Sequence, residues 1–262
     1  WQEKTKRFAT EITVGEVRRL RTFFNRTAAE GNWRVVIIDR AEDLNTAAAN
    51  ALLKNLEEPP ARCIFLLVCS APGRLPVTVR SRCRTLMFQP LGDSDLRNAI
   101  ASAYASAERE MPGSDELAAC LPLAQGSVER ALRLLDGGGS ELHQRLVALL
   151  GSLPGVDHEA VHALADDLSM VSADRTYELF FELVGETIAR IVSHGATGSG
   201  AIGKEAEISA RLENAAALAK FAQLWETVRR AKAEADALNL DRKNLVLGTF
   251  FRLEEAAREA FV

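Results

Sequence analysis

Apolar residues near the start of the chain recur at two spacings, one typical of helices and the other of buried strands. Residues 11–30 carry apolar side chains at steps of three and four, which predicts an amphipathic helix. These side chains are Val14, Val17, Leu20 and Phe24. A turn is expected at Gly31-Asn32, and residues 33–39 then form an apolar run that predicts a strand buried on both faces of a parallel sheet. Asp39 ends this run and should lie at the carboxyl edge of the sheet.

A second helix and two more strands are predicted further along. Asn45 is a residue type that caps helices, and Pro59-Pro60 forces the chain out of helical geometry. The apolar stripe between them consists of Ala49, Leu52, Leu53 and Leu56. The later elements expected from the pattern are a strand from Ile64 to Ser70, a turn at Pro72-Gly73, a short helix from Pro76 to about Arg82 and a strand at residues 85–88. Strands and helices alternating at this spacing predict a parallel α/β sheet.

Beyond Pro90 the pattern is that of helices alone. Gly137-Gly138-Gly139-Ser140 is expected to be a hinge between a short and a longer group of helices, and Gly195 to Gly203 a glycine-rich loop. One apolar stripe of the longer group consists of Leu212, Ala216, Leu218, Phe221, Leu224, Trp225 and Val228. The predicted fold class is therefore α/β plus all-α: a partial α/β domain at 1–90, a small helical domain at 91–137 and a helical bundle at 138–262.

Composition allows two or three domains and excludes some classes of function. The chain has 262 residues, of which 47% are hydrophobic, enough to bury at least one sizeable core. The formal charge is −4, so the protein as a whole does not present a basic surface for nucleic-acid phosphates. Four cysteines without a C-x-x-C pair fit reduced thiols in the cytoplasm, and no apolar stretch approaches the roughly 20 residues of a membrane span. The first residues have no signal-peptide layout. Because the chain begins at Trp1 rather than at a methionine, we expect further residues upstream.

Three blocks of sequence occur together in the α/β part. They are NALLKNLEEPP at 50–60, FLLV at 65–68 and Ser81-Arg82-Cys83. In this order and spacing they resemble the clamp-loader branch of the AAA+ family, and the segment LDRKNL at 240–245 is similar to the last collar segment of that branch. The resemblance implies a partial AAA+, P-loop NTPase-like domain at 1–90, a small helical lid at 91–137 and a helical collar at 138–262 that joins subunits into a ring.

Two positions depart from the motor subunits of that branch, which hydrolyse ATP. An active Walker B strand ends in Asp-Glu, because one carboxylate orients Mg²⁺ and the next polarises the attacking water. Here Asp39 is followed by Arg40, which cannot accept a proton. Residues 126–132 resemble the motor's sensor-2 helix, but Glu129 stands where the motor places an arginine, and its carboxylate would repel a triphosphate. Arg130 points about 100° away around a helix and is a poor substitute.

These departures favour a subunit of the delta prime type, which does not hydrolyse ATP. No G-x-x-x-x-G-K-[ST] loop occurs in the chain, although the resemblance would place that loop upstream of these residues. The resemblance implies that Ser81 and Cys83 shape an interface turn, from which Arg82 reaches ATP bound by a neighbouring subunit. Such an arginine finger is worth roughly 10³–10⁵ in rate. The alternative for Arg82 is an ordinary surface charge beside Arg80 and Arg84.

By the same resemblance, the chain is a subunit of the DNA polymerase III holoenzyme without catalytic activity of its own. The DNA-directed DNA polymerase (nucleotidyltransferase) and ATPase activities would belong to the complex. The implied partners are tau/gamma and delta subunits, the sliding clamp and, through the complex, primed DNA, in a cytoplasmic hetero-oligomer that acts in DNA replication away from membranes. No cofactor or metal is expected within these residues, neighbouring subunits would bind ATP, and a zinc module upstream stays an open question. The alternatives are a tau/gamma-type ATPase and an adaptor that uses only the helical bundle.

Other candidate sites have simpler interpretations. Residues 158–162 read H-E-x-x-H, the spacing that brings two imidazoles onto one helix face in zinc proteases. The extended third-ligand motif is missing, so a solvated helix start is the preferred interpretation. The paired acids Asp166-Asp167 and Glu57-Glu58 are expected to face solvent. The stripe around Phe221 and Trp225 is expected to be core packing rather than a platform for stacking bases.

Overall fold

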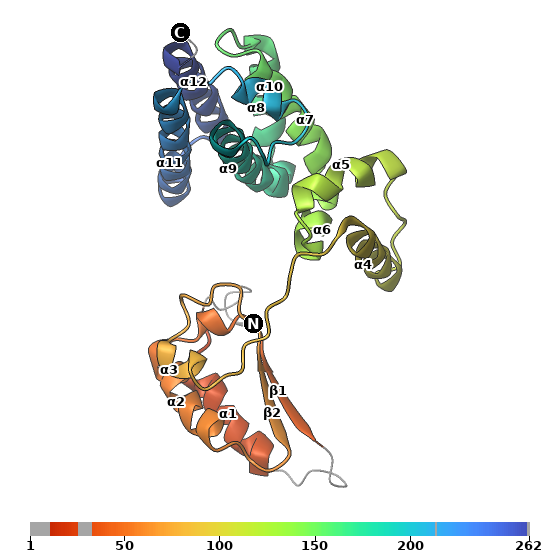
Figure 1. Ribbon diagram of the computed structural model, residues 1–262, viewed down its shortest axis with the longest axis vertical. Helices are drawn as coiled ribbons and strands as arrows, with labels where there is room; N and C mark the ends of the chain where they lie inside the picture. Colours follow the sequence, from red (N-terminus) through yellow and green to blue (C-terminus); the bar gives the residue numbers. More distant parts are fainter. Residues whose placement is uncertain (1–10, 26–32, 213, 261–262) are drawn as a thin grey trace. The chain divides into compact units, whose positions relative to one another are not determined.

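The computed structural model of the chain describes residues 11–25, 33–212 and 214–260 (Figure 1). The chain falls into two compact units, Trp1–Phe88 and Gln89–Val262, and each contains its own hydrophobic core. The first unit combines helices with a small parallel sheet, whereas the described part of the second unit is wholly helical.

Two parallel strands organise the first unit. Strand β1 (Arg34–Ile38) pairs with β2 (Cys63–Leu67), which confirms the parallel α/β arrangement for these two strands. The accompanying elements are α1 (Val14–Asn25), a 3-10 turn at Ala41–Asp43, α2 (Thr46–Glu57) and α3 (Val77–Arg80). Asn45 caps α2 as predicted, because its side chain accepts the backbone N–H of Ala48 at 2.9 Å. The predicted turn at residues 31–32 lies outside the described residues.

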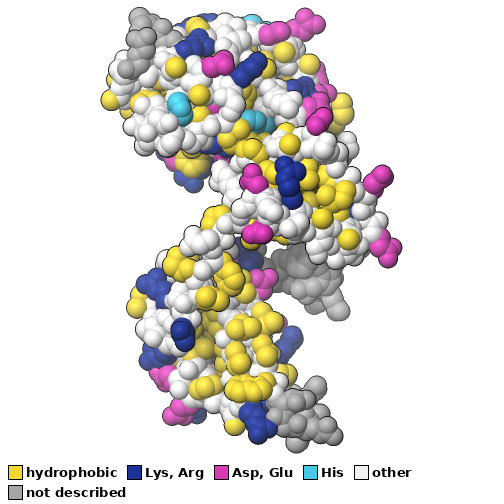
Figure 2. All heavy atoms as spheres, turned by 45° about the vertical axis from the view of Figure 1, so that its right-hand side comes forward, with side chains coloured by type: hydrophobic (Ala, Val, Ile, Leu, Met, Phe, Trp, Pro, Cys, Tyr) yellow, Lys and Arg dark blue, Asp and Glu magenta, His cyan; other side chains and the backbone are white. Residues whose placement is uncertain are grey.

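The two faces of this sheet have different surroundings. The core on one face lies under α1, α2 and α3, and its buried members include Val17, Leu52 and Val79. On the other face Val35 stands beside Ile64, and Ile37 beside Leu66, with exposed fractions between 42% and 65%. Figure 2 shows hydrophobic side chains gathered on the surface of this unit. The expectation that both faces are buried is therefore wrong for the described residues, because helices cover one face alone.

Residues 85–88, expected to be a third strand, have no regular secondary structure. Leu86, Met87 and Phe88 are 76–85% exposed. A strand needs hydrogen-bond partners along its length, and in the described part of the first unit β1 and β2 pair only with each other. The apolar run suggested burial, but a strand forms only where the fold supplies a neighbour.

The second unit consists of helices in its described residues, as the sequence predicts beyond Pro90. Their bounds are α4 (Asp93–Ser106), α5 (Ser114–Ala124), α6 (Val128–Asp136), α7 (Gly139–Gly151), α8 (His158–Ser169), α9 (Asp174–Thr197), α10 (Glu205–Ser209), α11 (Ala215–Leu238) and α12 (Arg242–Ala260), with a 3-10 turn at Val171–Ala173. One continuous core runs from Leu96 to Ala260. None of these described helices is both long and apolar enough to cross a membrane.

The expected hinge at residues 137–140 is a tight connection between α6 and α7, in which Gly138 adopts a φ of 64°. Arg133 of α6 forms an ion pair of 2.6 Å with Glu182 of α9. Buried residues before and after the connection belong to the same core. The division of these helices into a small domain and a bundle at this connection stays a prediction.

Candidate functional site

The Ser81-Arg82-Cys83 segment forms a turn directly after α3. Helix α3 is anchored by Val79, which is completely buried in the core of the first unit. The N–H of Ser81 donates to the carbonyl oxygen of Val77 at 2.9 Å. The N–H of Arg82 donates to the carbonyl oxygen of Val79 at 3.1 Å. The buried anchor and these two bonds fix the point from which the Arg82 side chain leaves the backbone.

The Arg82 guanidinium is held against its own unit. Its Nε donates to Glu57 Oε1 at 2.6 Å, and its Nη1 donates to the carbonyl oxygen of Thr78 at 2.8 Å. The side chains of Arg82 and Glu57 are 35% and 48% exposed. An ion pair at such exposure contributes about 0–1 kcal/mol. Little free energy therefore opposes the exchange of Glu57 for another anion.

Glu57 is the residue of this site that sequence reasoning missed. Glu57 and Glu58 are both exposed, as expected, but Glu57 also pairs with Arg82. The pair spans 25 positions and forms because α2 and α3 pack together. No spacing rule links the two residues, so the only signal was an acid at the end of a helix.

The residues on either side of Arg82 support the turn. Ser81 Oγ donates to the carbonyl oxygen of Thr78 at 3.2 Å. Cys83 is partly buried and packs against the core, and this burial raises the pKa of its thiol. Arg82 carries the positive charge of this segment, because the Ser81 hydroxyl and the protonated Cys83 thiol are neutral, so Arg82 is the group equipped to meet an external anion.

Asp39 and Arg40 follow β1 at the carboxyl edge of the sheet. Asp39 is exposed, and Arg40 has a left-handed backbone with a φ of 54°. The Nε of Arg40 donates to Asp43 Oδ2 at 2.7 Å. Arg40, the residue after Asp39, is therefore a cation paired with the Asp43 carboxylate. A guanidinium that stays protonated cannot act as a base.

Glu42 is a buried carboxylate at the same edge that no sequence motif marks. It is 8% exposed, and its Oε1 accepts the N–H of Ser70 at 3.1 Å. Burial opposes ionisation, but hydrogen bonds from the backbone N–H groups of Glu42 and Ser70 and from the Cys69 thiol, together with the charge of Arg40, outweigh it. The pKa of Glu42 is therefore lowered below its ordinary value. The carboxylate joins the loop after β1 to the loop after β2.

In the second unit, Glu129 and Arg130 lie in the first turn of α6 and have different environments. Glu129 is exposed. Arg130 turns inward, where its Nε donates to the carbonyl oxygen of Leu123 at 2.6 Å and its guanidinium pairs with Glu186 of α9. The Arg130 side chain is thus occupied by α5 and α9.

The glycine-rich loop contains a near match to a phosphate-binding loop. Residues 198–205 read G-S-G-A-I-G-K-E, which departs from the pattern at the last position. That residue, Glu205, is fully buried and accepts the N–H of Ile202 at 2.9 Å. Its carboxylate also bonds to Arg190 at 2.6 Å and to His143 at 2.9 Å. Because the chain's own carboxylate fills the loop, we do not regard it as a phosphate site.

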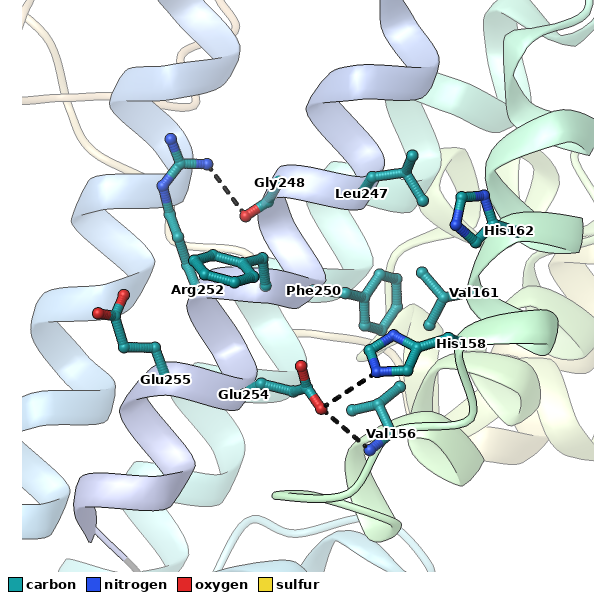
Figure 3. A pocket seen from close by; sticks show the side chains of 11 residues that line it. Val156, His158, Val161, His162, Leu247, Gly248, Phe250, Arg252, Glu254 and Glu255 are labelled. Carbon is teal, nitrogen blue, oxygen red and sulfur yellow. Dashed lines mark hydrogen bonds and ion pairs between the residues drawn. The ribbon is translucent and has the colours of Figure 1, made fainter.

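Two other candidates can be placed. His158 and His162 start α8 and line a pocket beside α12 (Figure 3). In the described ranges no three His, Cys, Asp or Glu side chains are grouped to hold a metal ion. Phe221 is completely buried, as expected for core packing, whereas Trp225 is 39% exposed with the Arg229 guanidinium 5.6 Å from its ring centre.

Comparison with known proteins links the chain to DNA polymerase III. Residues 2–92 match the family described as "DNA polymerase III, delta subunit". The delta prime subunit of Escherichia coli K12 is 39% identical over 147 residues, covering 56% of this chain and 42% of the relative. The tau subunit of Salmonella typhimurium is 33% identical over 189 residues, covering 70% and 28%. The resemblance to delta prime inferred from the sequence is confirmed by these matches, with tau subunits matching as well.

These relatives are longer than the segment they share with this chain, which spans less than half of the length of either one. A solved structure, a gamma subunit-related protein from Thermotoga maritima, aligns over 97% of this chain and 82% of its own. Its identity is 19% and the TM-score is 0.41, so this likeness carries no further argument.

Proposed function

We propose, on the premise that this chain is a relative of the delta prime and tau subunits of DNA polymerase III, that it is a clamp-loader subunit of the delta prime type. It would present Arg82 to ATP bound by a neighbouring tau/gamma subunit and so help to load the sliding clamp on primed DNA. The observation that carries this proposal is the setting of Arg82, which leaves an anchored turn, is 35% exposed and is restrained by a surface ion pair.

The chemistry of Arg82 suits this role. A guanidinium stays charged and offers a planar fork of donors to the oxygens of a transferring phosphoryl group. Glu57 and the carbonyl oxygen of Thr78 orient this fork before any partner binds. Because the ion pair with Glu57 is weak, the phosphate of a neighbouring subunit could replace that carboxylate.

The proposal that this subunit does not hydrolyse ATP rests on both altered positions. Arg40 supplies no base after Asp39 and is paired with Asp43. Glu129 is a carboxylate in the first turn of α6, and Arg130 is engaged by Leu123 and Glu186. A tau/gamma-type ATPase is the second candidate, favoured by the matches to tau subunits. ATP binding and turnover by the isolated full-length protein, which we expect to show no turnover, would separate the two.

We extend the proposal to architecture and partners. Residues 1–90 would belong to an AAA+ domain, 91–137 to its lid and 138–262 to a collar that joins tau/gamma and delta subunits in a cytoplasmic ring. ATP would be bound by the neighbouring subunits. An adaptor that uses only its helical bundle is the remaining alternative, and it predicts no effect of changing Arg82.

The test is ATP turnover, stimulated by clamp and primed DNA, in a loader reconstituted with the full-length subunit. Arg82→Ala should lower turnover at least several-fold, because the lost finger is worth roughly 10³–10⁵ in rate in well-studied cases. Arg82→Lys should restore little, since an ammonium lacks the planar fork. Unchanged turnover in an assembled complex would reduce Arg82 to a surface charge.

Arg80→Ala is the matched control for this experiment. Arg80 lies two positions earlier, is exposed, and donates to the carbonyl oxygen of Pro72 at 3.1 Å. We expect its loss to leave turnover close to wild type. Gel filtration of each reconstituted complex separates a loss of catalysis from a loss of assembly.

A further inference from the structure

A pocket of about 490 Å³ lies between α8 and α12 in the second unit (Figure 3). Its floor is apolar, with Val161 and Phe250 each 3% exposed. Phe251 also lines the pocket and is 66% exposed, a large value for an aromatic side chain. Glu254, at 5% exposure, brings a buried carboxylate to the same space. Apolar surface and a buried negative charge therefore share one opening.

The Glu254 carboxylate has weak partners for its depth. The N–H of Val156 donates to Oε1 at 3.3 Å, which is long for such a bond. His158 Nε2 lies 3.8 Å and Arg258 Nη2 lies 3.7 Å from that same oxygen, and both side chains are mostly exposed. A buried carboxylate is costly unless it is paired and hydrogen-bonded. All three contacts reach Oε1, so they leave Oε2 to a group that enters the pocket.

The other charges around the pocket do not supply the missing partner. Figure 3 shows Arg252 on the far side of α12 from His158, and its Nη1 donates to the carbonyl oxygen of Gly248 at 3.1 Å. Glu255 lies on that side too and adds a second, exposed carboxylate. An anionic ligand between α8 and α12 would meet the buried Glu254 carboxylate, whereas a cation would complement it.

We propose that this pocket is a docking site for a partner polypeptide that carries a lysine or arginine beside an apolar side chain. The cation binds the Glu254 carboxylate, where a charge-assisted hydrogen bond is stronger than one between neutral groups. The apolar side chain covers Phe251 and the floor formed by Val161 and Phe250, as in recognition of amphipathic segments by apolar grooves. This surface is separate from the turn that carries Arg82 and does not depend on the function proposed for it.

The test is a titration of the full chain, followed by amide ¹H–¹⁵N spectra, with two capped tetrapeptides. Leu-Leu-Lys-Leu should shift the amides of Val156, Gly248 and Phe251, and Leu-Leu-Glu-Leu should bind about tenfold more weakly or worse. Glu254→Gln should weaken binding of the lysine peptide about tenfold. Phe251→Ala, at an exposed position that folding does not require, should weaken it several-fold.

Glu159→Gln is the matched control, because Glu159 is exposed on the first turn of α8 and outside the pocket. Its affinity for the lysine peptide should equal that of wild type, and amides remote from the pocket report whether each variant is folded. Equal binding of the two peptides, binding unaffected by Glu254→Gln, or no localised shifts at all would overturn the proposal. Butylamine binding as tightly as the lysine peptide would also overturn it, since it would reveal a simple cation site.

Discussion

Two carboxylates of the first unit, Glu57 and Glu42, each hold a loop, but their burial gives them different energetic roles. The Glu57 side chain is 48% exposed, so its ion pair with Arg82 orients the guanidinium but contributes only about 0–1 kcal/mol to stability. Glu42 is 8% exposed and accepts a hydrogen bond from Ser70. Hydrogen bonds to buried charged groups are worth about 1.5–3 kcal/mol. Substitution of Glu42 should therefore alter stability, whereas substitution of Glu57 should mainly release Arg82.

Glu42→Gln should destabilise the first unit by about 1–3 kcal/mol near neutral pH, because a neutral amide accepts these hydrogen bonds more weakly. Urea unfolding of the full chain, followed by a probe in residues 1–88, measures the change. Glu58→Gln is the control, since Glu58 is exposed and its loss should matter little. Equal stabilities of the two variants would contradict the role assigned to Glu42.

The difference in stability between wild type and Glu42→Gln should depend on pH, because the pKa of Glu42 is lowered in the folded state. A carboxyl whose pKa is lower in the folded state contributes stability that is fully present above its ordinary, unfolded pKa. That contribution is lost as pH falls through the folded pKa. The stability difference between wild type and Glu42→Gln should accordingly shrink below the ordinary pKa of a glutamate.

At the scale of single residues, the sequence predicts a residue's role where that role depends only on neighbours along the chain. Asn45 was identifiable as a cap because its partner lies three positions away. Arg82 stands out through its motif, although its role in trans stays a prediction. Glu57 and Glu42 could not be identified, because their partners lie 25 and 28 positions away and are brought together by packing.

Among the elements, the turn between α5 and α6 is held by close backbone approach. Gly126 has a φ of 77°, and its carbonyl oxygen accepts the N–H of Leu91 at 3.1 Å. A Cβ at this position would lie 2.6 Å from the nitrogen of Leu91 and 2.6 Å from Cβ of Pro90. Glycine is thus required both by backbone conformation and by space.

Gly126→Ala should destabilise the second unit by roughly 2 kcal/mol or more, since strain in φ adds to a backbone clash. Gly138→Ala separates the two causes, because Gly138 has a φ of 64° but no atom within 4 Å of an added Cβ. That variant should lose only about 1 kcal/mol. Chemical denaturation of both variants makes the comparison, and equal losses would show that the clash relaxes.

The predicted helices form, whereas the strand predicted at residues 85–88 does not, and both outcomes have the same physical cause. Helical periodicity and caps are local, as in α2, whose stripe lies between Asn45 and Pro59. A strand depends on its neighbour, and residues 85–88 have none among the described residues. The apolar run was real, but its side chains are exposed on this chain.

For the molecule as a whole, two separate cores imply two separate stabilities. The first unit leaves one face of its sheet exposed, so it buries less of its apolar surface than a sheet covered on both faces. The second unit has one core from Leu96 to Ala260 and, within it, a buried cluster of Glu205, Arg190 and His143. Nothing local to the sequence marks this cluster, whose members lie on different helices.

We therefore expect calorimetry of the full chain to show two transitions, the first unit unfolding at the lower temperature because less apolar surface is buried there. Glu42→Gln should lower the midpoint temperature of the first unit's transition and leave the other transition unchanged. Glu205→Gln should lower the temperature of the other transition and destabilise that unit by about 3–5 kcal/mol, because the buried Arg190 guanidinium loses its nearest carboxylate and keeps only Glu186 at 3.8 Å. A single transition lowered by both substitutions would mean that the two cores unfold together, and the units would then owe their stability to one another.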